Sequence, residues 1–309
     1  MFYLIRRFIK YIYSRFFEPD GIKIYNFLLN LDEKQYPKHL KEQYRQHTGR
    51  RLNLDKPKTF NEKLQYLKLY NNSPLKTLLT DKAAVRKYIK DKIGIEYVKP
   101  FYIMCRHFDD IDFECLPDSF IIKCTHAADK WSCIIKNKNE FLDNSAFFEK
   151  IRRNMTVRLK HEYWVFNGFD LNYKGIKPRI LIEPLMRENP EKPPVSIRIY
   201  NFAGAPKFFF KYYGSFDDGV SVWDENYNEI KNFLNTGEPE ISTQPDDYIK
   251  LAADLSKQLI KDFKFAETDW IIFNNRLYFD KFDFAPYSGF LKTIDKEYNL
   301  LLGNLININ

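Results

Sequence analysis

The sequence predicts an α+β protein whose strands are arranged in antiparallel sheets. Residues 19–98 show mostly helical periodicity, whereas from residue 119 onward short apolar strands alternate with helices. Several of these strands are joined by short turns, as in hairpins, which argues against a doubly wound parallel sheet. At 309 residues the chain is long enough for one large domain or for several smaller lobes.

The N-terminal third contains two well-marked helices. In "PKTFNEKLQYLKLY" the apolar residues recur at helical spacing, and Thr59 and Glu62 are placed as a capping box. The stretch "LTDKAAVRKYIKDKIG" also has one apolar helical face and ends at Gly94, a residue type common at helix C-termini. The following stretch, "EYVKPFYIM", predicts a short strand interrupted by Pro100.

The rest of the chain is organised around strands. "SFIIKC", "WSCIIKN" and "KPRILIEPLM" predict three strands, with a basic helix at 146–162 between the second and the third. "VSIRIYNFAGAPKFFFKYY" predicts a hairpin that turns at Ala203-Gly204, and "TDWIIFNNRLYFDKFDF" predicts another that turns at Asn274-Asn275. Between the hairpins lie a loop-rich segment at 215–245 and an amphipathic helix, "DDYIKLAADLSKQLI".

The charge balance favours an anionic partner. The net charge is +8 and the isoelectric point is about 9.0, which suits nucleotide phosphate, an acidic polysaccharide or an anionic lipid. No helix-turn-helix pattern or aromatic stacking platform is evident in the sequence, so we do not expect nucleic acid as the partner. The four cysteines form no Cys-x-x-Cys pair, so we expect reduced thiols and a cytoplasmic location.

Residues 1–18, which begin "MFYLIRRFIKYIYSRFF", predict a basic amphipathic helix. Arg6, Arg7 and Lys10 lie on one narrow polar stripe of that helix. The cations make the segment too polar to span a bilayer, and it has no signal-peptide cleavage pattern. Two placements remain open: the helix contacts the inner face of the cell membrane as a peripheral anchor, or it docks against the body of the protein.

The order and wording of the later segments resemble the TupA-like branch of the ATP-grasp superfamily, which accompanies bacterial surface-polysaccharide and teichuronopeptide genes. The sequence stretches that carry the resemblance are "TFNEKLQYLKLYNNSPLKTLLTDKAAVRKYI", "FIIKCTH", "YKGIKPRILIEPLM", "FAGAPKFFF" and "FAPYSGF". The resemblance implies two antiparallel-sheet lobes around a nucleotide cleft. We therefore divide the chain into the N-terminal helix 1–18, a helix-rich part 19–118, a small ATP-grasp lobe 119–190 and a large ATP-grasp lobe 191–309.

ATP-grasp enzymes hold ATP between the sheets and activate a carboxylate as an acyl-phosphate, which an amine then attacks to form an amide. This chemistry requires cations on the phosphates, acidic ligands for Mg²⁺ and a backbone hinge for adenine. The resemblance places Lys123 on the phosphates, with Thr125 and His126 as further donors from the following loop. Glu183 and Leu185 match the adenine-facing hinge.

Lys82 and Arg86 match a "DK…R" signature of the family, and either line the cleft or flank an exposed helix. Arg198 stands where relatives carry a lysine, which supports a catalytic role on phosphate. Asp269 matches the first metal-binding acid, and Asp283 takes a neighbouring position of the metal motif.

The sequence departs from the family at two places. Relatives follow the lysine with "THGSGG", whereas this chain has "THAADKW", with Asp129 in place of a glycine. Relatives carry "GELTF" where this chain has "DKFDF", so that Lys281 replaces a metal-binding glutamate. A plain two-residue turn pairs Asp269 with Asp280, whereas a bulge brings Lys281 to that face instead.

These departures leave two interpretations of the metal site. Asp269 with Asp280 or Asp283 collects one Mg²⁺, or the Lys281 ammonium replaces a metal charge.

The leading functional hypothesis is an ATP-dependent ligase of surface-polysaccharide assembly, joining an amino-acid or amino-sugar amine to a uronic acid or another carboxylate of a glycan intermediate. The alternatives are a divergent ATP-grasp scaffold or sugar-binding protein without turnover, and a glycosyltransferase of the same pathway. The glycosyltransferase lacks support from an Asp-x-Asp pair, since the acids of "DKFDF" are three positions apart.

Overall fold

The computed structural model describes residues 19–308 except 188–193, 215, 217–218, 235–243 and 261–262. The predicted N-terminal helix at 1–18 lies outside the described residues. The helices are α2 (Pro19–Leu29), α3 (Tyr36–Thr48), α4 (Phe60–Tyr70), α5 (Pro74–Thr80), α6 (Val85–Ile93), α7 (Lys138–Asp143), α8 (Ser145–Arg158), α9 (Tyr163–Phe166), α10 (Asp247–Leu259) and α11 (Lys296–Leu305). The strands are β1 (Ile103–Cys105), β2 (Phe120–Cys124), β3 (Ser132–Ile135), β4 (Ile180–Pro184), β5 (Val195–Phe202), β6 (Ala205–Tyr213), β7 (Ser221–Asp224), β8 (Phe265–Phe273) and β9 (Arg276–Asp283).

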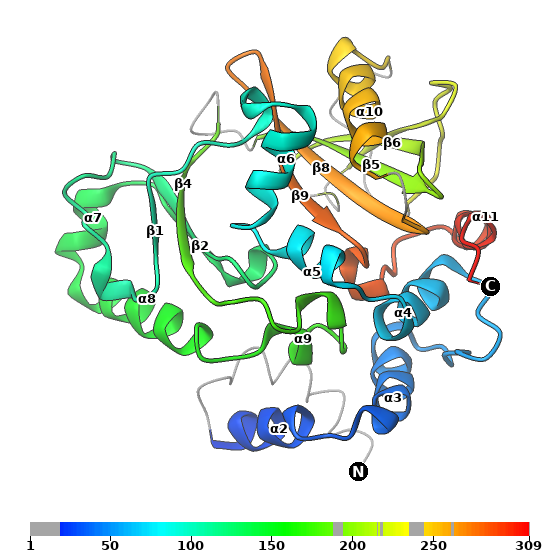
Figure 1. Cartoon of the computed structure of the whole chain (residues 1–309), viewed down its shortest axis with the longest axis horizontal. Helices are drawn as coiled ribbons and strands as arrows, with labels where there is room; N and C mark the ends of the chain where they lie inside the picture. Colours follow the sequence, from blue (N-terminus) through cyan, green and yellow to red (C-terminus); the bar gives the residue numbers. More distant parts are fainter. Residues whose placement is uncertain are drawn as a thin grey trace.

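The strands form two sheets, which lie next to each other in Figure 1. The four-stranded sheet has the order β1-β4-β2-β3, and the five-stranded sheet has the order β7-β6-β5-β8-β9. Every neighbouring pair of named strands is antiparallel. The predicted α+β class with two antiparallel sheets is therefore confirmed.

Local sequence signals account for most of the helix boundaries. Thr59 and Glu62 form the predicted capping box at the start of α4. The Thr59 hydroxyl accepts a hydrogen bond from the backbone N–H of Glu62, and the Glu62 carboxylate accepts one from the backbone N–H of Thr59. Gly94 follows α6 with a φ of 117°, a backbone conformation that glycine adopts without steric cost. The strand predicted at "EYVKPFYIM" is shorter than expected, because Ile95–Tyr97 form a 3-10 helix and β1 begins at Ile103.

Both predicted hairpin turns are present, and the second hairpin contains a bulge. Asn274 and Asn275 have φ values of 49° and 55°, the left-handed pair required by a type I′ turn. The regular register from this turn reaches Trp270 opposite Phe279, but the next pair joins Asp269 to Lys281. Asp280 is the extra residue of a β-bulge, so the pairing of Asp269 with Asp280 that a plain turn predicts is not found.

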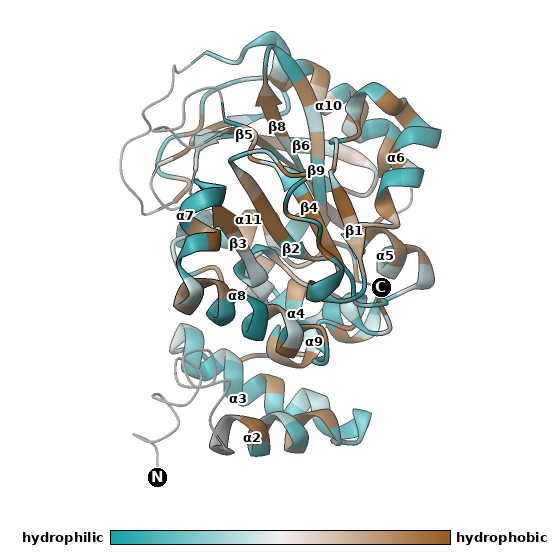
Figure 2. Ribbon diagram, turned by 90° about the vertical axis from the view of Figure 1, so that its left-hand side faces the viewer, coloured by the Kyte–Doolittle hydropathy of each residue, from teal (hydrophilic) through white to brown (hydrophobic). Residues whose placement is uncertain are grey.

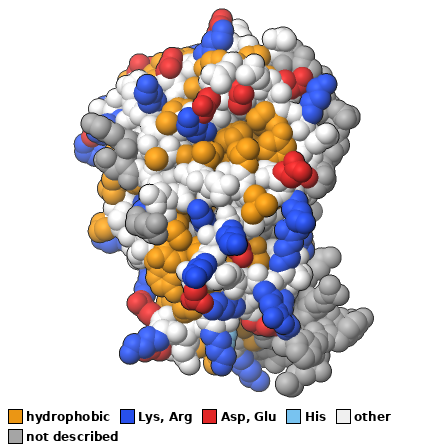
Figure 3. Space-filling view, turned by 90° about the vertical axis from the view of Figure 1, so that its right-hand side faces the viewer, with side chains coloured by type: hydrophobic (Ala, Val, Ile, Leu, Met, Phe, Trp, Pro, Cys, Tyr) orange, Lys and Arg blue, Asp and Glu red, His pale blue; other side chains and the backbone are white. Residues whose placement is uncertain are grey.

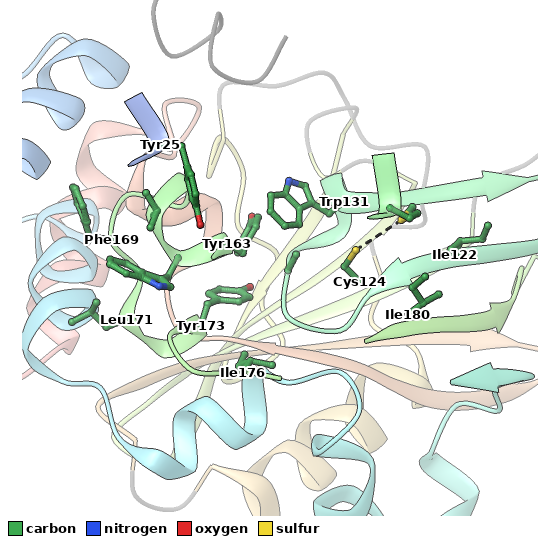
Figure 4. Packing of buried hydrophobic residues seen from close by; sticks show 14 of the residues in the cluster. Tyr25, Ile122, Cys124, Trp131, Tyr163, Phe169, Leu171, Tyr173, Ile176 and Ile180 are labelled. Carbon is green, nitrogen blue, oxygen red and sulfur yellow. Dashed lines mark hydrogen bonds between the residues drawn. The ribbon is translucent and has the colours of Figure 1, made fainter. Parts of the chain in front are cut away.

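Three hydrophobic clusters hold the two sheets and their helices together. The four-stranded sheet packs with residues of α2, α3, α7, α8 and α9. Figure 4 shows Tyr25 of α2 and Tyr163 of α9 within this cluster. One face of the five-stranded sheet packs on α6 and α10, and the other face on α4 and α11. Ribbon colouring by hydropathy agrees, since strands β2, β4 and β8 are largely brown and the outer helices α6 and α8 largely teal (Figure 2).

Period-two alternation in β5 explains how one strand serves two environments. Ile197 and Ile199 belong to the cluster with α6 and α10, whereas Tyr200 and Phe202 face α4 and α11. Arg198 shares the second face and is buried there. A buried cation thus lies on the same strand face as Tyr200 and Phe202.

The surface shows scattered charge on the face viewed in Figure 3, where Lys and Arg side chains are interspersed with acidic and apolar ones. Within the part of the chain that the structure describes, no helix has the length and apolarity needed to cross a membrane.

Candidate functional site

Residues of both sheets line a shared cavity of about 380 Å³, which we call the first chamber. Lys123 and Glu183 reach it from β2 and β4, and Asp269 and Lys281 reach it from β8 and β9. Its apolar wall consists of Ile121, Ile134, Leu185, Met186 and Ile271. Side chains from distant parts of the sequence therefore converge between the two sheets.

Glu183 is the centre of a buried ion network at the back of the first chamber. Its carboxylate lies 3.1 Å from the Nζ atoms of both Lys99 and Lys123, and 3.4 Å from Nη1 of Arg86. Lys99 also donates to Asp280. Three cations thus face two carboxylates, leaving one positive charge in excess at this end of the chamber.

The ion network shifts the ionisation of its members. Burial alone would raise the pKa of Glu183, but Lys123 and Lys99 outweigh burial and lower that pKa to about 2. Burial alone would lower the pKa of Lys123, but the Glu183, Asp280 and Asp129 carboxylates outweigh it and raise that pKa above its ordinary value. Lys123 is therefore a fixed positive charge at neutral pH.

A row of alternating charges crosses the large sheet at the opposite wall. Arg198, Asp269 and Lys281 are direct neighbours on β5, β8 and β9. The Arg198 guanidinium donates to both Asp269 carboxylate oxygens, at 2.9 and 3.0 Å, and Lys281 Nζ lies 3.6 Å from Oδ2 of Asp269. We call this set the charge row.

Lys281 also bridges the two sheets, because its Nζ donates to Asp129 Oδ2 at 2.9 Å. Asp129 begins a 3-10 helix (Asp129–Trp131) in the glycine-free loop between β2 and β3. Lys281 is the main cause of the strongly lowered pKa of Asp129. Asp129 and Lys281, the two positions at which we expect the sequence to depart from the family motifs, thus pair with each other.

The glycine-free loop is anchored in the core of the four-stranded sheet. Ala127 is fully buried, and Trp131 packs edge-on against Tyr163 with ring centroids 5.1 Å apart (Figure 4). Apolar burial of this kind stabilises a fixed loop conformation. Asp129 is held at the chamber by a loop whose two ends are packed.

A second chamber of about 790 Å³ adjoins the first and shares Asp129, Tyr212, Gly214 and Lys281 with it. Its walls are rich in aromatic residues: Tyr163, Phe166, Tyr173, Phe216, Tyr287 and Phe290. Arg198, Glu267 and Asp283 also line it. A large aromatic cavity with a few charged groups is typical of a small-molecule site.

Glu267 and Asp283 lie opposite each other on β8 and β9, two residue pairs beyond the charge row. Burial raises the pKa of both carboxyl groups, Asp269 raises both further, and Asp283 adds to the rise in the pKa of Glu267. Glu267 is fully buried, and neither of its oxygens has a hydrogen-bond partner among the described residues. Arg198 Nε is 3.2 Å from Oε1 of Glu267, an ion-pair contact without hydrogen-bond geometry.

Residues 62–307 match the TupA-like ATPgrasp family. The chain belongs to this family. Two similar solved structures are D-alanine–D-alanine ligases: the enzyme from Bacillus anthracis complexed with ATP (14% identity, 77% of this chain and 68% of that chain, TM-score 0.38) and the enzyme from Helicobacter pylori (12% identity, 80% and 69%, TM-score 0.42). No curated protein matches the chain.

The positions predicted for the phosphates are distributed over two layers of this ATP-grasp protein. Lys123 lines the first chamber directly. Lys82 and Arg86 lie behind it around a small cavity of about 20 Å³, which Lys99 also lines. Lys82 donates to the carbonyl of Ala127, and Arg86 donates to the carbonyl of Lys99. They support the chamber from behind.

Neither Thr125 nor His126 lines either chamber. Thr125 is buried, and its backbone N–H and hydroxyl bond to the backbone of Arg179. His126 bonds to the carbonyl of Arg158 at 3.2 Å, and burial lowers its pKa to about 4. Leu185, by contrast, lines the apolar wall of the first chamber.

The three carboxylates predicted to bind Mg²⁺ do not come together. Asp280 pairs with Lys99, Asp269 pairs with Arg198, and Asp283 lines the second chamber. Among the described residues, no group of three or more His, Cys, Asp or Glu side chains is arranged to hold a metal ion. The residues present do not fit the metal site that the family motif implies.

Lys99, a central residue of the site, was missed in the sequence. It directly follows Val98, which forms an isolated bridge with Phe279 of β9, and it is buried between Glu183 and Asp280. The sequence signal available was weak, since a lysine before proline indicates only extended backbone. Its partners lie 84 and 181 positions away, beyond any local pattern.

Proposed function

We propose that this ATP-grasp protein is an ATP-dependent carboxylate–amine ligase of bacterial surface-polysaccharide assembly. The observation that carries the proposal is the convergence of Lys123 from the small sheet with Lys281 and Arg198 from the large sheet around one cavity system. Cations fixed on two facing sheets are the arrangement that a polyphosphate requires.

The first chamber is the proposed nucleotide site. A purine fits the apolar wall beside Leu185, and the phosphates fit the end that carries Lys123 and Lys281. The excess positive charge around Glu183 favours an anionic ligand there.

The second chamber is the proposed site of the carboxylate and the amine, because it opens onto the phosphate end at Lys281 and Asp129. The substrate carboxylate attacks the γ-phosphorus of ATP and ADP leaves. The amine nitrogen then attacks the acyl carbon, and phosphate leaves. Glu267 and Asp283, with pKa values raised by burial, are suited to accept the proton that the substrate ammonium must lose.

The expected carboxylate is a uronic acid or another acid of a glycan intermediate, and the expected amine is that of an amino acid or amino sugar. Aromatic walls and scattered charges suit a saccharide body. A cytoplasmic protein, in peripheral contact with the membrane through residues 1–18, would reach a lipid-linked acceptor.

Nucleotide binding tests the proposal directly. Lys123→Ala should weaken ATP binding at least tenfold in titration calorimetry, since a charge-assisted hydrogen bond contributes roughly 1.5–3 kcal/mol. Lys136→Ala, which removes an exposed lysine just after β3, should leave the affinity unchanged. Wild-type protein that binds no ATP at millimolar concentration would eliminate the ligase.

A scaffold without turnover is the second candidate, favoured by the cations around Asp269 and by the separation of the predicted metal acids. It predicts nucleotide binding without ADP release in the presence of glycan acid and amine. ADP release that depends on both substrates would exclude the scaffold.

A further inference from the structure

We infer that Lys281 and Arg198 supply, where the first chamber adjoins the second, the positive charge that a divalent cation would supply, so that this site takes a nucleoside polyphosphate free of metal. The inference rests on the proposed nucleotide site.

The charge row already satisfies the acid that would bind a metal. Asp269 is 3% exposed, and each of its carboxylate oxygens accepts a hydrogen bond from Arg198. Lys281 Nζ stands on the same side, 3.6 Å from Oδ2. A magnesium ion would need to approach these oxygens to about 2.1 Å and would have to displace one or both cations.

The β-bulge in β9 is the reason that Lys281, a cation, lies opposite Asp269. Without the extra residue, the Asp280 carboxylate would face Asp269 across the strands. With it, Lys281 faces Asp269, and Asp280 turns to Lys99. The backbone therefore exchanges an acid for an ammonium at the position opposite Asp269.

The charges of the row balance without a metal. Arg198 and Lys281 face Asp269 and Asp129. Glu267 also lies 3.2 Å from Arg198, and Lys82 lies 3.9 Å from Asp129, so three cations meet three carboxyl groups. Of these acids, Asp129 is the one that a ligand can most readily displace. Its side chain is 46% exposed, and it belongs to the loop between β2 and β3 of the opposite sheet. A phosphate group of the nucleotide is the anion that can replace the Asp129 carboxylate on Lys281.

Titration calorimetry of ATP binding with and without Mg²⁺ tests whether the site takes the metal-free nucleotide. Wild-type protein should bind ATP in excess EDTA within about threefold of its affinity in excess Mg²⁺. Lys281→Glu, which places an acid beside Asp269, should bind ATP at least tenfold more weakly in EDTA than in Mg²⁺. The matched control Lys136→Glu makes the same charge change at an exposed site and should behave as wild type.

Two further measurements keep the test decisive. Lys281→Gln removes the cation without adding an acid, so it should weaken ATP binding under both conditions, even where the glutamate variant does not fold. Manganese titration followed by electron paramagnetic resonance needs no nucleotide: wild-type protein should bind no Mn²⁺ at this site. Stoichiometric Mn²⁺ binding that Lys281→Gln alters, or a tenfold loss of wild-type ATP affinity in EDTA, would overturn the inference.

Failure of the proposed function gives a different pattern. Protein that binds no ATP under either condition contradicts the nucleotide site, while the manganese titration still reports whether the charge row excludes a metal.

Discussion

At the scale of single residues, Glu183 shows how strongly the site depends on ion pairing. The contacts with Lys123 and Lys99 outweigh burial and hold its pKa near 2, against an ordinary value of 4.5. Because the folded state lowers this pKa, the ion network stabilises the fold above pH 4.5, and the stabilisation is lost as the pH falls toward 2.

Glu183→Gln should therefore destabilise the protein at pH 7 by about 3–5 kcal/mol, because three buried cations lose their common partner. The difference between variant and wild type should shrink as the pH falls from 4.5 toward 2. Urea unfolding at pH 7, 4 and 3 measures both effects. Glu114→Gln, at an exposed position, should leave the free energy of unfolding unchanged at each pH; equal losses in both variants would contradict the network.

The candidate residues that the sequence placed best are those at strand ends. Lys123 and Glu183 close apolar runs, and a charged residue at such a position is visible in the pattern itself. Lys99 and the partner role of Asp129 were not predictable, because their contacts join segments far apart in the chain. Thr125 and His126 were placed by motif, but the packing of their loop turns them inward.

At the scale of elements, the bulge in β9 follows from packing rather than from turn chemistry. Leu277 and Phe279 share a core cluster with Phe282 and Phe284, although odd and even positions of a regular strand face opposite sides. One inserted residue between Phe279 and Phe282 brings both pairs to the same side. The asparagine turn was predictable from local sequence, but a bulge depends on which face is buried.

The contact between α11 and the start of α4 gives an element-scale prediction. A methyl group at Gly303 would lie 2.1 Å from the carbonyl oxygen of Lys58, so the two segments would have to move apart. Gly303→Ala should lower the stability by about 1–3 kcal/mol, as overpacking does. Thermal unfolding tests this, with Asn304→Ala, an exposed position of the same helix, as the control that should not lower the melting temperature.

At the scale of the whole molecule, the ion pair of Lys281 with Asp129 connects the two sheets across the first chamber. If nucleotide phosphate replaces Asp129 on Lys281, then Asp129→Asn should bind ATP more tightly, by up to about fivefold, the range expected for a partly exposed ion pair. Titration calorimetry at low salt measures the change. An unchanged or weaker affinity would show that Asp129 does not compete with the ligand.

The two-sheet architecture was predictable because it rests on repeated local patterns, namely alternating strands, short turns and capped helices. β7 was not predicted, since its four residues lie in a segment without a clear alternation. The relative placement of the sheets depends on side chains that meet only in the folded chain, as Lys281 and Asp129 do.

The burial of Trp131 gives the protein an optical reporter. Its indole ring belongs to the same single helical turn as Asp129, and it contacts His126 and Tyr163 on the inner side of that turn. Release of Asp129 by a ligand would shift the surroundings of the indole, so emission intensity should follow nucleotide addition. Trp131→Phe should abolish that signal while the remaining tryptophans keep the baseline, which makes occupancy of the chamber observable without labels.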